Sequence, residues 1–220
     1  QMCIRDSDGK YVVFSSNRSG IFSIWRMNAD GSNPAQLTNE QNTIDTQPQI
    51  TKDGQSVIFM RQTSDGGNNK IMKVSIDGGE VKQVIADNNS GEYFPRLSPD
   101  GKLLAFHTFE FDTNLPNVEP KLMVFPFNNE IFKKDFKEFK ININPEFRFS
   151  PDSKSLTYIN RAGFDNIWNV SLENNKETPL TDFTSGNIAN FHWSNDGKKL
   201  FIIRAIYNSD LVLIKDNFKS

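Results

Sequence analysis

The sequence predicts an all-β protein, and three observations support this class. Helical periodicity is almost absent from the 220 residues, a turn signature recurs five times, and an apolar run of β-forming residues follows each copy. The aspartates of the signature are Asp8, Asp53, Asp100, Asp152 and Asp196, so the spacings are 45, 47, 52 and 44 residues. A period of about 40 to 50 residues is typical of the four-stranded blade of a β-propeller. We therefore expect a partial β-propeller, an open arc of four-stranded antiparallel blades, about four in number plus part of a fifth.

The repeated turn has a physical basis in its residue types. In its fullest form, at residues 98–102, it reads Ser-Pro-Asp-Gly-Lys. Proline presets φ, aspartate accepts hydrogen bonds from nearby backbone N–H groups, and glycine takes the left-handed conformation that returns the chain to a strand. The residues expected to build the turns are Asp8, Gly9, Asp53, Gly54, Pro99, Asp100, Gly101, Pro151, Asp152, Asp196 and Gly197.

Three positions depart from this turn pattern. Lys52 and Asn195 replace the proline, and Ser153 replaces the glycine of the fourth turn. A non-glycine residue in the left-handed region costs about 1–2 kcal/mol. We therefore expect the fourth turn to be of a different type.

The strands of each repeat are expected in a fixed order. Each turn leads into a strand at residues 11–14, 57–59, 103–106, 156–159 and 200–203. Inner strands precede the later turns at residues 94–97, 147–149 and 191–193. Third strands are expected at residues 24–27, 71–74 and 167–170, and outer fourth strands at 35–38, 81–85 and 178–181. Each repeat thus alternates tight turns with longer loops.

The third repeat carries a longer, lysine-rich segment at residues 131–140. Phe132, Phe136 and Phe139 are spaced like one face of a helix, whereas the apolar residues from Phe139 onward alternate like a strand. Both alternatives stay open. The segment is either a basic insert that binds a partner or a solvated face over a phenylalanine core, and the second is favoured because acidic residues interrupt the lysines.

Composition bears on several functions. The formal net charge of −2 leaves no electrostatic footprint for nucleic acid. No apolar run approaches the roughly 20 residues that span a bilayer, so we expect no membrane insertion by this segment. Phenylalanine, with 19 residues against 3 Trp and 4 Tyr, suits a core better than a wet stacking platform.

No motif predicts catalysis. The sequence has no Gly-x-Ser-x-Gly elbow, P-loop or dinucleotide fingerprint, and turn chemistry explains the repeated aspartates. The histidines, His107 and His192, stand far apart, and His192 beside Trp193 is expected to be structural. A metal site lacks a ligand set. We expect a protein that is not an enzyme and that uses neither a metal nor a cofactor.

The topology of a blade predicts where a partner would bind. Tight turns share one face of the propeller, and the longer loops share the other, here called the loop face. The second-to-third-strand loops are expected at residues 15–20, 61–69, 107–119, 160–165 and 204–209, and the between-blade loops at 39–47, 87–93 and 182–189. Function usually resides on long loops held by a rigid scaffold, so we expect a protein or peptide partner there.

Four arginines recur near the exit of the second strand: Arg18, Arg61, Arg161 and Arg204. They are candidates to ring the mouth of the channel and to meet an anionic or backbone-carbonyl ligand. The alternative is that each guanidinium pairs locally with an aspartate or a carbonyl and fixes its own loop.

The turns, together with the stretch "VVFSSNRSGIFSIWRMNADGSNPAQLT" between the first two, resemble the TolB-type β-propeller repeat. The resemblance covers residues 8–220. It implies a bacterial, non-catalytic binding or sensor module, the C-terminal domain of a larger signalling or regulatory protein whose upstream domain is missing. The alternatives are a periplasmic envelope scaffold of the TolB type and the gating propeller of a prolyl-oligopeptidase-like enzyme. The compartment stays open.

Residues 1–7, which contain the single cysteine Cys3, do not fit the repeat. A DNA sequence that encodes them resembles the end of a transposase adapter used in preparing sequencing libraries. We expect residues 1–7 to be foreign to the natural protein and the natural chain to enter at the first turn.

Overall fold

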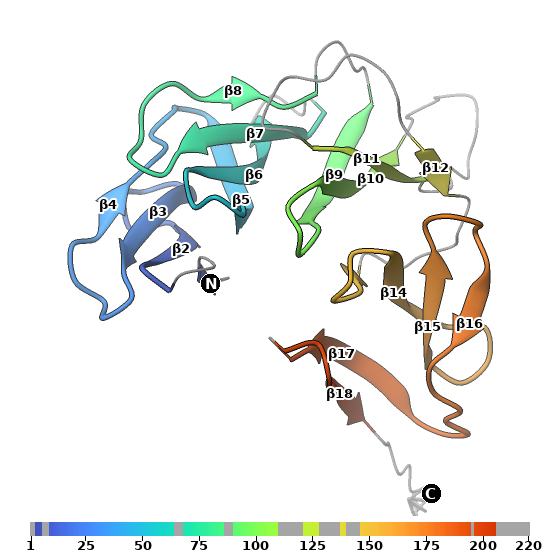
Figure 1. Ribbon diagram of the computed structural model, residues 1–220. Coiled ribbons are helices and arrows are strands. Elements are labelled where there is room, and N and C mark those ends of the chain that lie inside the picture. The colour runs from blue at the N-terminus through green and yellow to red at the C-terminus, as the bar shows by residue number, and fades with distance from the viewer. Residues whose placement is uncertain are drawn as a thin grey trace, which may run out of the picture.

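The computed structural model describes residues 3–5, 9–63, 68–85, 90–109, 121–127, 137–139, 146–194 and 196–205. These residues contain no helix and form five antiparallel sheets, four of four strands and one of two. Each sheet is one blade, and the blades follow one another around an open arc (Figure 1). The predicted all-β, partial propeller is therefore confirmed.

The strands follow one another in chain order within every blade. Blade 1 comprises β1 (Cys3–Arg5), β2 (Tyr11–Ser16), β3 (Ser23–Asn28) and β4 (Ala35–Gln36). Blade 2 comprises β5 (Thr43–Ile50), β6 (Ser56–Thr63), β7 (Lys70–Ser75) and β8 (Lys82–Gln83). Blade 3 comprises β9 (Gly91–Leu97), β10 (Leu103–Phe109), β11 (Lys121–Pro126) and β12 (Lys137–Phe139). Blade 4 comprises β13 (Phe147–Phe149), β14 (Ser155–Asn160), β15 (Asn166–Ser171) and β16 (Glu177–Pro179), and blade 5 comprises β17 (Asn187–Trp193) and β18 (Leu200–Ala205).

The first strand of each blade lies at the inner side of the arc, and in the four-stranded blades the fourth strand lies at its periphery (Figure 1). The predicted between-blade loop at residues 39–47 is too long, because β5 already begins at Thr43. This strand is polar and contains Pro48, a residue that sheets tolerate at an edge. In the lysine-rich segment, Lys137–Phe139 is a strand and Phe139 is buried, while residues 131–136 lie outside the described residues.

Strand β1 pairs with β2, with Cys3 opposite Phe14 and Arg5 opposite Val12. An open strand edge presents unpaired backbone groups that accept many sequences. The pairing is therefore compatible with either origin of residues 1–7, and their foreign origin stays a prediction. Asp8 and residues 206–220 lie outside the described residues.

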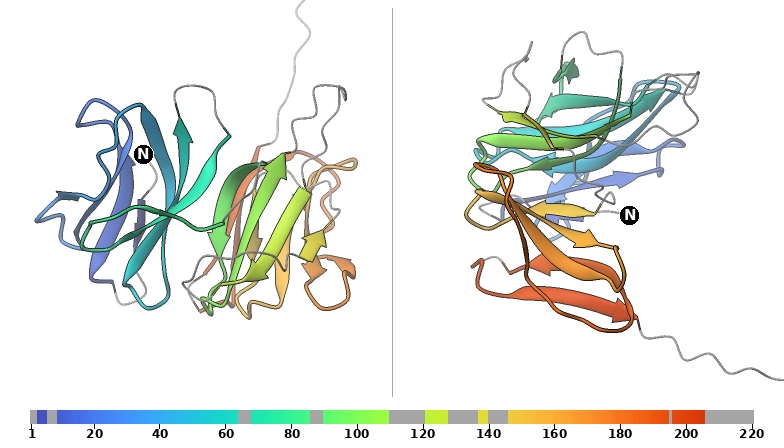
Figure 2. Two further views of the ribbon diagram at one scale, coloured as in Figure 1. Left: turned by 90° about the horizontal axis from the view of Figure 1, so that it is seen from above. Right: turned by 90° about the vertical axis from the view of Figure 1, so that its right-hand side faces the viewer.

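The hydrophobic core is divided into layers between consecutive blades, which stack face to face (Figure 2). The same position of the second strand supplies a fully buried ring in four successive blades, at Phe14, Phe59, Phe106 and Tyr158. The Tyr158 hydroxyl donates to Glu177 Oε2 at 2.7 Å, which satisfies its polar end. Each blade therefore depends on its neighbours for burial, as in other repeat proteins.

The described turns share one hydrogen-bond pattern. The N–H of the fourth residue donates to the carbonyl of the first, at 2.8 Å for Gly54 and 2.9 Å for Gly101, Ser153 and Gly197. Ser153 has a φ of 60°, so the prediction of a different type for the fourth turn is wrong. Its hydroxyl accepts a hydrogen bond of 3.1 Å from the Asp100 N–H in the neighbouring blade. This contact offsets part of the cost of the left-handed conformation.

Neighbouring turns also touch through carbon atoms. A Cβ added at Gly101 would lie 2.4 Å from Lys52 Cβ, and one added at Gly197 would lie 2.5 Å from Pro151 Cβ. The repeated turn therefore acts as an inter-blade contact as well as a connection between strands.

We predict that Gly54→Ala and Gly101→Ala differ in their effect on stability. Both glycines have a φ of 70–75°, so each alanine should lower the free energy of unfolding by about 1–2 kcal/mol. Gly54 has open space around it, whereas Gly101→Ala also forces a clash with Lys52, which should cost a further 1–3 kcal/mol or so. Urea unfolding followed by far-UV circular dichroism measures both losses. Adding Lys52→Gly to both variants should narrow the difference between their losses in free energy of unfolding. Equal losses for Gly54→Ala and Gly101→Ala would contradict the contact between Gly101 and Lys52.

Candidate functional site

The four predicted arginines lie near the loop face, but they do not all occupy equivalent positions in their blades. Arg61 in β6 and Arg204 in β18 are equivalent, opposite Asp45 and Ile188 of their inner strands. Arg18 and Arg161 lie in the loops that follow β2 and β14.

Arg61 is buried in an ion-pair network. Its Nε and Nη2 donate to the two carboxylate oxygens of Asp45 at 2.8 and 2.9 Å, and its Nη1 donates to Glu40. Burial lowers the pKa of Arg61, but the hydrogen bonds and charges of Asp45 and Glu40 together outweigh burial, so the pKa is raised overall. This guanidinium ties the loop between blades 1 and 2 to the sheet.

Two other arginines also bind local acceptors. Arg161 Nη1 donates to Asp165 Oδ2 at 2.5 Å, and the same oxygen accepts the Ile188 N–H of the next blade at 2.8 Å. Arg204 Nη2 donates to the Ser185 carbonyl at 2.5 Å, and its guanidinium lies 3.7 Å from the centre of the Phe183 ring. Arg161 therefore holds the loop between β14 and β15, which contacts blade 5 through Asp165, and Arg204 holds the loop between blades 4 and 5.

Arg18 differs from the other three. Its Nε donates to the Ser16 hydroxyl at 3.1 Å, and its guanidinium lies 4.9 and 5.1 Å from the ring centres of Phe14 and Trp25. It is exposed and, among the residues that the structure describes, has no carboxylate partner. The local-pairing alternative thus describes Arg61, Arg161 and Arg204 well, and ligand binding by the four arginines stays a prediction.

The loop face also presents large apolar side chains that the sequence analysis missed. Phe22 and Ile44 are 41% and 40% exposed, and Phe164 is 58% exposed. Phe22 and Ile44 are neighbours, because the Asp45 N–H donates to the Phe22 carbonyl at 2.9 Å. The available signal was an aromatic residue inside a polar second-to-third-strand loop, which occurs at Phe22 and at Phe164.

A second group of polar residues lies at the inner edge of the arc. Gln49, Arg96 and Arg148 occupy the same position, two residues before the N–H that opens each repeated turn. Those N–H groups, of Thr51, Ser98 and Ser150, donate to the second strand of their blades at 2.9, 2.9 and 2.8 Å.

The orientation of the backbone follows from that pattern. Backbone groups alternate between the two edges of a strand, and a trans peptide holds each C=O opposite the next N–H. The carbonyls that precede Gln49, Arg96 and Arg148 therefore face away from the second strand, toward the free inner edge. Each of the three side chains turns back to donate to that carbonyl, at 3.1, 3.0 and 2.9 Å.

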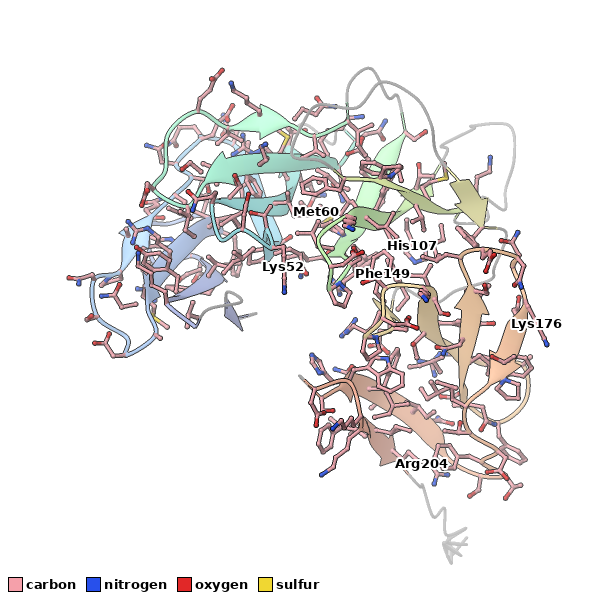
Figure 3. All side chains as sticks on the ribbon, in the orientation of Figure 1. Lys52, Met60, His107, Phe149, Lys176 and Arg204 are labelled. Atoms are coloured by element: carbon pink, nitrogen blue, oxygen red, sulfur yellow. The ribbon has the colours of Figure 1, made fainter. Side chains whose placement is uncertain are left out.

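Arg96 and Arg148 influence each other and a nearby histidine. Burial, and then the charge of Arg148, lower the pKa of Arg96 to about 10, while the charge of Glu146 acts in the opposite direction. Burial also lowers the pKa of Arg148. His107, between blades 3 and 4 (Figure 3), packs on the Phe147 ring at 5.2 Å between ring centres. Burial, and then the charge of Arg96, lower the pKa of His107 to about 4, so its ring is neutral at pH 7.

The turn aspartates are engaged in local hydrogen bonds. Asp100 Oδ1 accepts from the Ser98 hydroxyl at 2.6 Å and from the Lys102 N–H at 3.0 Å, and Asp53, Asp152 and Asp196 repeat this pattern. These bonds keep the pKa of Asp152 and Asp196 below its usual value. Within the described ranges, no three His, Cys, Asp or Glu residues gather as metal ligands, and no helix is long and apolar enough to cross a membrane.

The repeat geometry agrees with a family match. Residues 6–118, more than half of the chain, match the family described as TolB beta propeller domain. The chain belongs to the TolB beta-propeller family. A relative of this TolB-type propeller, named Protein TolB homolog, from Chlorobium luteolum, is 28% identical over 159 residues, which are 72% of this chain and 33% of the relative.

Solved structures show the same fold. TolB from Acinetobacter baumannii superposes on this TolB-type propeller with a TM-score of 0.65 and 18% identity, covering 91% of this chain and 47% of that one. A puromycin-hydrolyzing peptidase from Mycobacterium tuberculosis superposes with a TM-score of 0.63 and 18% identity, covering 92% and 35%. At such identities the likeness concerns the fold alone. The chain spans about a third of the length of the curated relatives it matches, 33% and 34%.

Proposed function

We propose that this TolB-type propeller is a non-catalytic module that binds a protein or peptide on its loop face. The observation that carries the proposal is the set of exposed apolar side chains there, Phe22, Ile44 and Phe164. Large aromatic anchors dominate the energetics of protein interfaces. Arg18, stacked on aromatic rings at the same face, supplies a cation of the residue type that interfaces enrich.

The rigidity of the loops supports the same proposal. Arg61, Arg161 and Arg204 each anchor a loop through ion pairs or carbonyl contacts. A preorganised surface loses less conformational entropy when it binds. In this proposal, these three arginines position the binding loops, and Arg18 contacts the partner.

The non-catalytic part of the proposal rests on the state of the candidate chemical groups. His107 is buried against Phe147. His192 lies on another blade, with its Nδ1 2.5 Å from the Trp193 carbonyl. The turn aspartates are engaged by their own turns. None of these groups is paired with a second catalytic group among the described residues.

We place the module in a larger bacterial signalling or regulatory protein, where the loop face would report the presence of its partner. The likeness to TolB of Acinetobacter baumannii favours an envelope scaffold as the second candidate. Both roles use the propeller for protein binding and make the same prediction for the loop face.

We predict that a peptide selected from a random library on the immobilised chain loses affinity when the apolar loop residues are changed. Phe22→Ser and Phe164→Ser should each weaken binding by about tenfold or more, because each removes an exposed aromatic anchor. Isothermal titration calorimetry measures the affinity. Phe201→Ser is the matched control, since Phe201 is also exposed, at 59%, but lies in β18 close to the tight turn of blade 5, at the opposite face from the loops. Selected peptides that bind both phenylalanine variants as tightly as the unchanged chain would refute the proposal.

A further inference from the structure

We propose that Arg96 and Arg148 form a binding site for a multiply charged oxyanion, a carboxylate or phosphate group, at the inner edge of the arc. This site is separate from the loop face and from the four arginines near it. The argument rests on the position of the two side chains, on their hydrogen bonds and on the charges around them.

The two arginines are held in equivalent positions on neighbouring inner strands. Arg96 in β9 pairs with Ala105 of β10, and Arg148 in β13 pairs with Thr157 of β14. Strands β9 and β13 are in contact with each other. Each Nη1 donates to the carbonyl of the preceding residue, at 3.0 and 2.9 Å. Each guanidinium is therefore directed to the free inner edge of its own strand, on the same side of the arc.

Neither guanidinium has a carboxylate within ion-pair distance among the residues that the structure describes. A guanidinium has five N–H donors, and the described contacts of each arginine occupy one of them. Both side chains are half-buried, so solvent reaches the remaining donors only in part. Arg61, by contrast, meets two carboxylates in the same propeller.

The electrostatic surroundings favour an added negative charge. Arg96 and Arg148 repel each other strongly enough to lower the pKa of Arg96, beyond what burial does. Among the residues that the structure describes, Glu146 is the carboxylate that acts on both, and it also lies 4.0 Å from Arg161, so its single negative charge does not balance the two positive ones. His107, close to Arg96, is neutral at pH 7 and adds no positive charge. Two half-buried cations without full compensation are unfavourable, and an oxyanion that accepts from both would relieve this.

The chemistry of arginine defines the ligand class. The planar guanidinium fork binds carboxylate and phosphate oxygens in pairs, which a lysine does not reproduce. Gln49 continues the same row on β5 with a neutral amide donor. In blades 2 to 4 the row therefore offers two cations and one neutral donor, an arrangement that suits an extended polyanion better than a single halide.

Citrate and inorganic phosphate are the probes for this site, each titrated into the 220-residue chain by isothermal titration calorimetry in a buffer free of other oxyanions. We expect one of them to bind at one site per chain, and the tighter probe identifies the ligand as a carboxylate or a phosphate. Arg96→Gln and Arg148→Gln should each weaken that binding by about tenfold or more, because a hydrogen bond to a charged group usually contributes that much to the affinity. Arg148→Lys should also weaken it, because the charge remains but the fork is lost.

Two controls separate this site from general charge effects and from the loop face. Arg26→Gln removes one cation from blade 1 and should leave anion binding unchanged. Phe22→Ser should likewise leave anion binding unchanged, so loss of the proposed protein-binding function does not imply loss of this site. Absence of binding by both probes, or equal affinity in Arg96→Gln, Arg148→Gln and Arg26→Gln, would overturn the proposal.

Discussion

Arg61→Met is expected to lower the free energy of unfolding by about 3–5 kcal/mol, the usual cost of removing one member of a buried ion pair. The Asp45 side chain is 2% exposed, and both of its carboxylate oxygens depend on Arg61. Methionine fills a similar volume but leaves this carboxylate buried without its partner. Urea unfolding followed by tryptophan fluorescence measures the loss, since Trp25 lies in blade 1, the neighbour of blade 2.

A double-mutant cycle tests whether the pair causes this effect. The combined variant Asp45→Leu, Arg61→Met removes both charges, so its loss should be clearly smaller than the sum of the two single losses. Arg18→Met, which removes an exposed guanidinium, should cost less than about 1 kcal/mol. A loss for Arg61→Met no larger than that for Arg18→Met would show that the buried pair does not stabilise the propeller.

Phe106→Ala is expected to lower the free energy of unfolding by a similar amount, about 3–5 kcal/mol. Phe106 is 1% exposed in the core layer between blades 2 and 3 and packs edge-to-face on Phe125, with ring centres 5.9 Å apart. Alanine would leave a cavity in a layer that joins two blades. Thermal and urea unfolding, followed by far-UV circular dichroism, measure this loss.

Phe201→Ala provides the matched control for Phe106→Ala. Phe201 is 59% exposed on β18, beside Ile203, which is 63% exposed. The opposite face of β18 packs through Leu200 and Ile202 against the layer shared with blade 4. Phe201→Ala should therefore change stability by about 0.5 kcal/mol or less. Equal losses for the two alanine variants would contradict the division of the core into layers between blades.

Local patterns were enough to predict most of the strands. The second strands are apolar and follow an Asp-Gly turn, or Asp-Ser in blade 4. The third strands at residues 24–27, 71–74 and 167–170 contain the alternating apolar residues that a buried blade requires. The sequence analysis did not predict the innermost strand of blade 2, because Thr43–Ile50 is polar. A strand with a free edge at the inner side of the arc does not need the apolar pattern on which the prediction relied.

The fourth turn shows how a tertiary contact can overrule a local preference. Taken alone, Ser153 at a glycine position predicts another turn type, yet Ser153 takes the same left-handed conformation as the glycines. The reason lies 53 residues away, at the Asp100 N–H, which donates to the Ser153 hydroxyl. No local pattern contains that partner.

The sequence by itself determined the all-β class, the repeat period, the turn chemistry and the TolB-type resemblance, because each depends on residues close together along the chain. Only the tertiary structure decided which arginines are already paired. Arg61 meets Asp45 and Glu40, which lie 16 and 21 residues before it, whereas Arg96 and Arg148 meet no described carboxylate at ion-pair distance. Spacing in a sequence reports which residues recur, but the charge that surrounds a side chain is set by the blades that fold against it.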